Sequence, residues 1–150
     1  YNNLGILFSD LGDYDKAREY WEKSLATRLK LFGEEHADVA STRDLLGDVL
    51  ANLDRTDEAL GQYRLAAAAG NVWSMYTLGL HLVCDDSQSV QLEGVDWLVK
   101  AAEAENESAA KLIEGLEGIP REEWPWNVRE RLAADDEEDT DPAGDPEPEQ

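Results

Sequence analysis

Apolar residues in the first 32 positions of the chain recur every three or four residues, a spacing that places them on one face of a helix. A polar segment at residues 12–15 interrupts this spacing and supplies residues that favour turns and helix caps. The pattern therefore predicts two antiparallel helices joined by a short turn. The positions that set the pattern are Tyr1, Leu4, Gly5, Phe8, Ala17 and Trp21.

The same pattern returns later in the chain, so the sequence contains an internal repeat. A shift of 42 residues aligns five of these positions with Leu46, Gly47, Leu50, Ala59 and Tyr63. A third and looser copy comprises Met75, Leu78, Gly79 and Leu82, followed after a connection three residues longer by Gly94, Trp97 and Leu98. A glycine inside a helix costs ~1 kcal/mol relative to alanine. The glycine that follows leucine in each copy therefore predicts a close approach of the paired helix.

Residues 1–69 resemble tetratricopeptide repeats of the long, kinesin-light-chain-like type. The resemblance rests on the core spacing, on the segment NNLGILFSDLGDYDKAREYWEKSL and on the linker RLKLFGEEHADVA. It departs from that type at Ala37, where proline is usual, and at Arg43, where an aromatic residue is usual. Residues 66–116 are similar to the shorter Sel-like repeats, through AAAAGNVWSMYTLGLHL and the recurrence of Asn71 as Asn106. Both resemblances imply an all-α, right-handed α-solenoid of antiparallel helix pairs, with a concave groove that binds peptides or proteins and no catalytic activity of its own.

The repeats and the composition divide the chain into a folded part and a tail. Residues 1–134 are expected to form one repeat domain, with repeats at about 1–36, 37–69 and 70–105, a capping helix at 106–117 and a tryptophan-containing extension at 118–134. Residues 135–150 hold nine of the 34 acidic residues and no Lys, Arg, aromatic or branched apolar residue, so we expect this acidic tail to be disordered. Trp124 and Trp126 are expected to fold back on the end of the solenoid; alternatively, they form a short linear ligand for another protein.

The net charge of −21 disfavours partners that are themselves negatively charged, so nucleic acid and anionic membranes are not expected as partners. No apolar run approaches the ~20 residues that cross a bilayer. The only cysteine, Cys84, has no partner for an intramolecular disulfide, and a cytoplasmic location is expected. The chain begins at Tyr1 inside a repeat and without an initiator Met, so we expect it to be part of a longer protein. The oligomeric state stays open.

Side chains able to perform catalysis or to bind metals are few. His36, His81 and Cys84 are the only histidines and the only cysteine, and the spacing of His81 and Cys84 indicates a packed pair on one helix face rather than a metal site. The acidic residues near the first turn lack the spacing of a calcium loop and are better explained as helix caps. No glycine-rich phosphate loop is present. The sequence therefore predicts no catalytic residue, no cofactor and no metal site.

The family geometry implies a groove lined by residues of the first helix of each pair, between the core positions. It would offer carboxylates from the second repeat and apolar side chains from the third, so a protein or peptide of basic or apolar character is the expected partner. The function favoured is a protein- or peptide-binding scaffold. The alternatives are a regulatory or sensor portion of a larger bacterial signalling or NTPase protein, and a structural spacer or oligomerisation arm. The expected groove residues are Asn2, Ile6, Ser9, Asp44, Asp48, Ala51, Tyr76, Leu80 and Val83.

Overall fold

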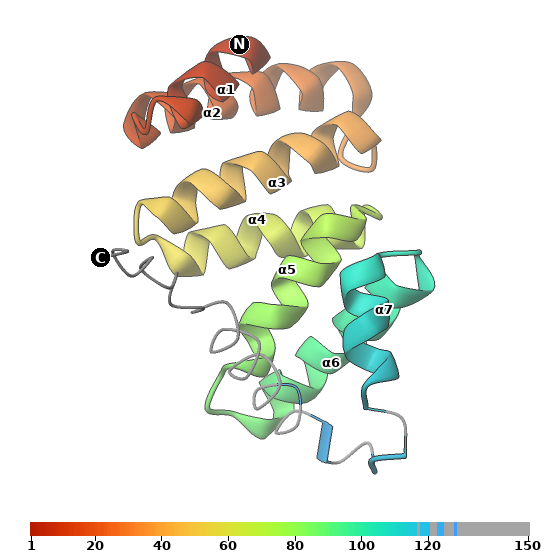
Figure 1. Ribbon diagram of the computed structural model, residues 1–150. Coiled ribbons are helices and arrows are strands. Elements are labelled where there is room, and N and C mark those ends of the chain that lie inside the picture. Colours follow the sequence, from red (N-terminus) through yellow and green to blue (C-terminus); the bar gives the residue numbers. More distant parts are fainter. Residues whose placement is uncertain (117, 121–122, 125–127, 129–150) are drawn as a thin grey trace, which may run out of the picture.

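The computed structural model describes residues 1–116, 118–120, 123–124 and 128, and in these residues it contains seven α-helices and no strand. Short connections join the helices, and successive helices form antiparallel pairs (Figure 1). The all-α solenoid of helix pairs is therefore confirmed. The helices are α1 (Asn2–Asp10), α2 (Tyr14–Phe32), α3 (Ala37–Asn52), α4 (Thr56–Ala68), α5 (Val72–Val83), α6 (Gln88–Glu103) and α7 (Glu107–Glu114). The acidic tail, for which the sequence predicts disorder, lies outside the described residues.

Three turns close the helix pairs, and they fall at the polar interruptions of the apolar pattern. The α1–α2 turn places Gly12 at a positive φ of 71°. Asp13 then caps α2, because its carboxylate accepts a hydrogen bond from the backbone N–H of Lys16 at 3.3 Å. The longer connection predicted in the third copy is largely absent. Most of the extra residues extend the start of α6, which begins six residues before Gly94, whereas α4 begins three residues before Ala59.

The helices α3, α5 and α7 begin 35 residues apart, at residues 37, 72 and 107. The start of α5 is capped by Asn71, whose side-chain oxygen accepts a hydrogen bond from the N–H of Ser74 at 2.9 Å. Asn106 caps α7 in the same way, with the N–H of Ala109 as donor at 2.9 Å. The recurrence of asparagine in the sequence therefore has a physical cause, because this side chain satisfies an N–H group that the helix itself leaves without a partner.

Three mid-helix glycines, Gly5, Gly47 and Gly79, lie where paired helices approach each other closely. A Cβ atom built on Gly5 would lie 2.6 Å from the ring of Trp21, and one built on Gly47 would lie 2.6 Å from the ring of Tyr63. In the third pair, a Cβ on Gly79 would lie 2.7 Å from the side chain of Leu98. Each distance is well inside van der Waals contact. The close approach predicted from the sequence is confirmed at all three glycines.

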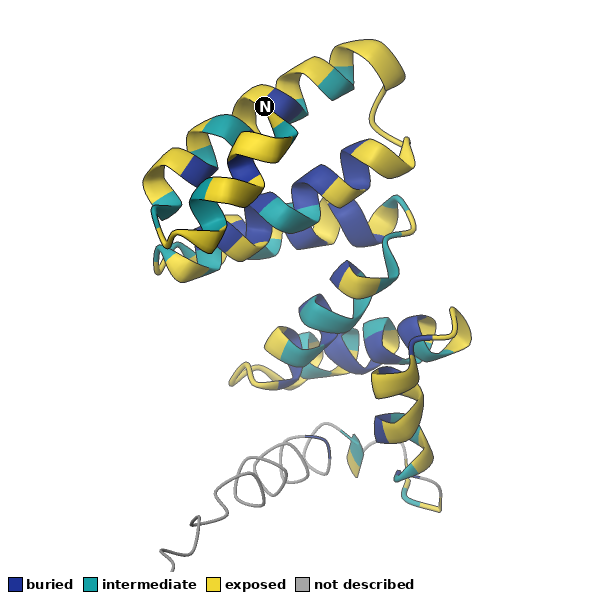
Figure 2. Cartoon of the chain, turned by 45° about the horizontal axis from the view of Figure 1, so that its top comes forward, coloured by how far each residue is buried: buried dark blue, intermediate teal, exposed yellow. Residues whose placement is uncertain are grey.

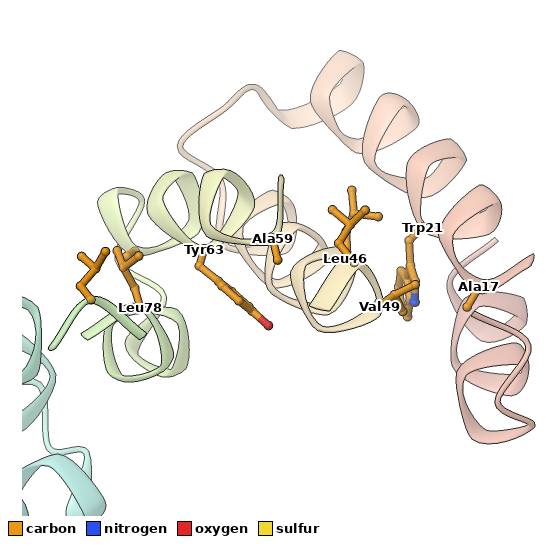
Figure 3. Packing of buried hydrophobic residues seen from close by; sticks show 10 residues of the cluster. Ala17, Trp21, Leu46, Val49, Ala59, Tyr63 and Leu78 are labelled. Carbon is orange, nitrogen blue, oxygen red and sulfur yellow. The ribbon is translucent and has the colours of Figure 1, made fainter. Parts of the chain in front are cut away.

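The larger core cluster extends across α2, α3, α4 and α5. Figure 3 shows Trp21 of α2 packed toward Leu46 and Val49 of α3, with Tyr63 of α4 on the other side of α3. Leu46 is 4% exposed and Tyr63 is 2% exposed, so both side chains belong to this core. Leu4, the equivalent of Leu46 in the first copy, is 39% exposed; α1 packs mainly on α2, whereas α3 lies between α2 and α4.

A second core cluster closes the other end of the described solenoid. It joins side chains of α5 and α6 to residues of α7 and beyond: Val83, Val95, Leu98, Leu112, Leu116 and Val128. Trp124 packs against this cluster, and its indole N–H donates a hydrogen bond to the carbonyl oxygen of Ile119 at 2.8 Å. The expected folding back is confirmed for Trp124, while Trp126 lies outside the described residues.

Buried residues follow the sides of the helices that face one another, and exposed residues follow the outer sides (Figure 2). In Figure 1, α1 to α4 lie roughly side by side, while α5 runs at a steep angle to α4. Its first turn therefore comes to lie near the α6–α7 connection. Among the described residues, no helix combines the length and the apolar character of a membrane span.

Candidate functional site

The side chains expected to line a groove come from the first helix of each pair, α1, α3 and α5. On α1, Asn2 and Ser9 are half-buried, and Ile6 is 44% exposed. The Ser9 hydroxyl donates a hydrogen bond to the carbonyl oxygen of Gly5 at 2.9 Å, so it is already engaged within the helix. The surface of α1 thus offers the amide of Asn2 and several apolar side chains, Ile6 among them.

The two carboxylates expected in the groove, Asp44 and Asp48 on α3, accept hydrogen bonds from neighbouring helices. Asp44 is half-buried and accepts a hydrogen bond from the hydroxyl of Ser74 on α5. Asp48 is exposed and accepts a hydrogen bond from the hydroxyl of Tyr63 on α4 at 2.7 Å. Because these bonds join α3 to α4 and α5, the two carboxylates contribute to the fold as well as to the surface.

Asp44 and Asp48 differ in how well they can bind a cation. Burial raises the pKa of the Asp44 carboxyl above its usual 3.8; the Ser74 hydrogen bond opposes this rise and the charge of Asp48 adds to it. Burial also raises the pKa of the Tyr63 phenol above its usual 10.0, and the hydrogen bond to Asp48 acts in the same direction, so the phenol remains a donor. A carboxylate has about four acceptor positions, and Asp48 is exposed. Asp48 is therefore better suited than Asp44 to bind a cation.

On α5 the expected residues differ in accessibility. Tyr76 and Leu80 are half-buried and pack against the second core cluster, as Ala51 of α3 does against the first. Val83 is 0% exposed, so its assignment to a groove open to a ligand is wrong. The cause is the close approach of α5 and α6, because a Cβ on Gly94 would lie 2.7 Å from the backbone nitrogen of Val83.

An exposed tryptophan extends this face of α5 by one turn toward its N-terminal end. Trp73 is 63% exposed and meets the ring of Tyr76 edge to face, with ring centroids 6.2 Å apart and an interplanar angle of 74°. Residues 73, 76 and 80 have the i, i+3, i+7 spacing of one helix face. The sequence-based set began at Tyr76 and missed Trp73. Counting back three residues from Tyr76 along the same helix face would have identified it.

Two depressions flank Trp73. One of about 250 Å³ lies between the start of α3 and the α4–α5 connection, and one of about 290 Å³ lies between the start of α5 and the α6–α7 connection. A third, of about 160 Å³, lies between the α2–α3 connection and α4. None of the nine expected groove residues lines these three depressions. The lining of the first is Ala37, Ala40, Ser41, Ala69, Gly70, Asn71, Val72 and Trp73, and that of the second is Val72, Trp73, Glu105, Asn106, Glu107 and Ser108.

The histidines and the cysteine have structural surroundings. The ring Nδ1 of His36 accepts a hydrogen bond from the N–H of Asp38 at 3.1 Å and so caps α3. His81 is exposed and stacks on the ring of Tyr63, with centroids 6.2 Å apart, and Cys84 is exposed at the end of α5. The packed pair expected of His81 and Cys84 is therefore wrong, because both side chains are exposed. Within the described part of the chain, no three His, Cys, Asp or Glu residues form a group that could hold a metal ion.

Residues 1–70 match the family model of the tetratricopeptide repeat. The match covers α1 to α4, the two helix pairs in which glycine faces Trp21 and Tyr63. Together with the solenoid of helix pairs, it supports a tetratricopeptide-type repeat protein. No curated protein and no solved structure matches the chain significantly.

Proposed function

We propose that this tetratricopeptide-type repeat protein is a scaffold that holds a peptide or a segment of another protein against the first helices of its pairs, α1, α3 and α5. Tetratricopeptide repeats generally mediate contacts between proteins, and residues 1–70 match that family. The observation that carries the proposal is that all three helices keep accessible side chains between their core positions: Ile6 and Asp48 are exposed, and Tyr76 is half-buried.

The chemistry of these side chains favours a partner with basic and apolar groups. Ile6 and Tyr76 offer apolar surface, and aromatic side chains contribute disproportionately to binding at interfaces. Asp48 offers the accessible carboxylate, while Asp44 serves mainly to hold α3 against α5 through Ser74. The proposal thus assigns the basic contact to Asp48 and leaves no catalytic role to the described residues.

Two finer assignments belong to the same proposal. We infer that residues 1–69 are repeats of the long, kinesin-light-chain-like type and that residues 66–116 are Sel-like, which the capping asparagines Asn71 and Asn106, 35 residues apart, support. We also infer a cytoplasmic location, because the exposed thiol of Cys84 suits a reducing compartment.

Selection of short random peptides by the full chain tests the proposed function. Enriched peptides should bind less tightly to the Ile6→Ser and Tyr76→Ala variants than to the unchanged chain, whereas Leu31→Ala, an exposed site on α2, should have no effect. Raising the salt concentration from ~0.1 M to ~1 M shortens the Debye length from ~10 Å to ~3 Å and should weaken binding. The Asp48→Asn variant should show less of this salt dependence. Selection that enriches no peptide would contradict the proposal.

A specific observation also favours a second candidate function, an oligomerisation arm. Leu4 and Leu7 lie three residues apart on α1, Leu11 follows directly after its end, and all three are exposed. Light scattering over a range of chain concentrations tests this role. If α1 mediates self-association, the mass should rise with concentration and should fall back to that of one chain in a Leu7→Ser, Leu11→Ser variant. A mass of one chain at every concentration would exclude the arm.

A further inference from the structure

Trp73 is an aromatic side chain in an unusual position. It lies in the first turn of α5, is 63% exposed, and its only ring contact among the described residues is the edge-to-face contact with Tyr76. No hydrogen bond engages its indole N–H within the described residues. A tryptophan with most of its surface in water gives up the apolar burial that this side chain offers, and tryptophan is enriched among the residues that dominate binding energy at protein interfaces.

The surface around Trp73 has the form of a ridge between two hollows. Trp73 and Val72 line both depressions, of about 250 Å³ and about 290 Å³. An extended peptide directs residues i and i+2 to the same side, roughly 7 Å apart. This spacing allows two side chains of one peptide to lie on either side of a single aromatic ring. The arrangement therefore fits a short extended segment that crosses Trp73.

The first hollow suits an apolar side chain. Its α3 wall consists of Ala37, Ala40 and Ser41, and its other wall is the short segment 69–71, so none of its lining residues carries a charge. The small size of these side chains leaves the space open. A small aliphatic side chain placed here would gain apolar contacts with Ala37 and Ala40. It would not need to form a hydrogen bond with a buried polar group.

The second hollow suits a cation. Glu105 and Glu107 both line it and are both exposed. A cation placed there would lie near carboxylates and the Trp73 side chain; carboxylates attract a positive charge, and so does the face of an indole ring. An anion is disfavoured, although two helices begin nearby. The carboxylates repel it, and the cap side chains of Asn71 and Asn106 already accept hydrogen bonds from N–H groups at the starts of α5 and α7.

We propose that Trp73 is the anchor of a two-hollow peptide site, and that its partner is an extended peptide with Arg or Lys two residues away from a small aliphatic residue. The basic side chain lies between Trp73 and the carboxylates of Glu105 and Glu107. The aliphatic side chain packs against Ala37 and Ala40. This inference rests on the proposed scaffold function and extends its surface beyond Ile6, Asp48 and Tyr76, with a second contact for a basic side chain and a defined class of partner. It adds Trp73, which lies on the same face of α5 as Tyr76, to the binding surface.

The test uses three fluorescent probe peptides on a Gly-Ser background, whose central residues are Arg-Ser-Val, Glu-Ser-Val and Arg-Ser-Ser. Fluorescence polarisation with the full chain should show the tightest binding for Arg-Ser-Val, with each replacement weakening it by at least ~10-fold. The Trp73→Ala variant should weaken Arg-Ser-Val binding to a similar extent. A Glu105→Gln, Glu107→Gln variant should weaken it and remove most of its salt dependence.

Two control variants remove similar side chains away from Trp73 and test whether the effects on binding are specific to its site. Leu31→Ala removes an equally exposed apolar side chain from α2, and Glu34→Gln, Glu35→Gln removes two carboxylates that line the third depression. Both should change Arg-Ser-Val binding by less than ~2-fold, while circular dichroism shows that every variant keeps its helices.

Two outcomes overturn the inference. One is binding of Arg-Ser-Val that is unaffected by Trp73→Ala, and the other is equal binding of Arg-Ser-Val and Glu-Ser-Val. If random-peptide selection still yields binders that depend on Ile6 and Tyr76, the scaffold function stands and only the Trp73 site falls. If selection yields no binder, the scaffold function falls as well.

Discussion

Replacing Gly47 by alanine tests the closest contact between α3 and α4. The new Cβ would lie 2.6 Å from Cε1 and 2.8 Å from Cδ1 of the Tyr63 ring. The ring has little room to move, because Tyr63 is 2% exposed and its hydroxyl is bonded to Asp48. Alanine favours the helix by ~1 kcal/mol over glycine, while overpacking of a core costs ~1–3 kcal/mol. The expected net change in the free energy of unfolding is therefore a loss of up to about 2 kcal/mol.

Gly61 in α4 is the matched control for this substitution. It also lies inside a helix, but a Cβ built on it would have nothing within 4 Å. Gly61→Ala should therefore keep the propensity gain and raise the free energy of unfolding by ~0.5–1 kcal/mol. Urea denaturation followed by circular dichroism measures both changes, provided that the slope stays constant. If Gly47→Ala proves as stabilising as Gly61→Ala, the close approach of the two helices is refuted.

The remaining predictions concern the same core. Leu46→Ala should lower the free energy of unfolding by ~2–5 kcal/mol through cavity formation, and a loss below ~1 kcal/mol in urea denaturation would contradict the burial of Leu46. Tyr63→Phe removes the hydrogen bond to Asp48 and should cost ~1 kcal/mol by the same assay; no change would mean that water replaces the bond without penalty. Asp44 has a raised pKa in the folded state, so folding favours its protonated form, and its contribution to stability falls as the pH rises from 3.8 through the raised pKa. The urea midpoint of Asp44→Asn should therefore increase, relative to that of the unchanged chain, as the pH rises over this range. A difference between the two midpoints that does not change with pH would contradict the effect of burial on Asp44.

The fold could be read from the sequence because the repeat spacing carries local physical constraints. Gly5, Gly47 and Gly79 occupy the same position in each repeat copy, and the recurrence of a residue that costs helix stability indicated a close helix contact there. Asn71 and Asn106 revealed helix starts through capping. These signals depend on residues close to one another in the chain, so a single sequence is sufficient to show them.

The candidate site was less accessible to sequence reasoning because it depends on contacts between distant residues. The sequence shows that Asp44 and Asp48 are acidic, but their partners Ser74 and Tyr63 follow 30 and 15 residues later. The burial of Val83 likewise depends on how closely α5 and α6 pack. The exposure of Trp73 and the two hollows beside it arise from the juxtaposition of three helix starts, which no local pattern records.

Chemical-shift mapping on the ¹⁵N-labelled full chain tests the central claim, which is that the first helices of the pairs form the binding surface. The probe is a peptide obtained by random selection against the chain. The account predicts that amide signals from α1, α3 and α5 shift most, together with the indole N–H signal of Trp73, while the signals of α2, α4 and α6 change little. Shifts concentrated in α2, α4 and α6 would place the partner on the opposite helices and contradict the account.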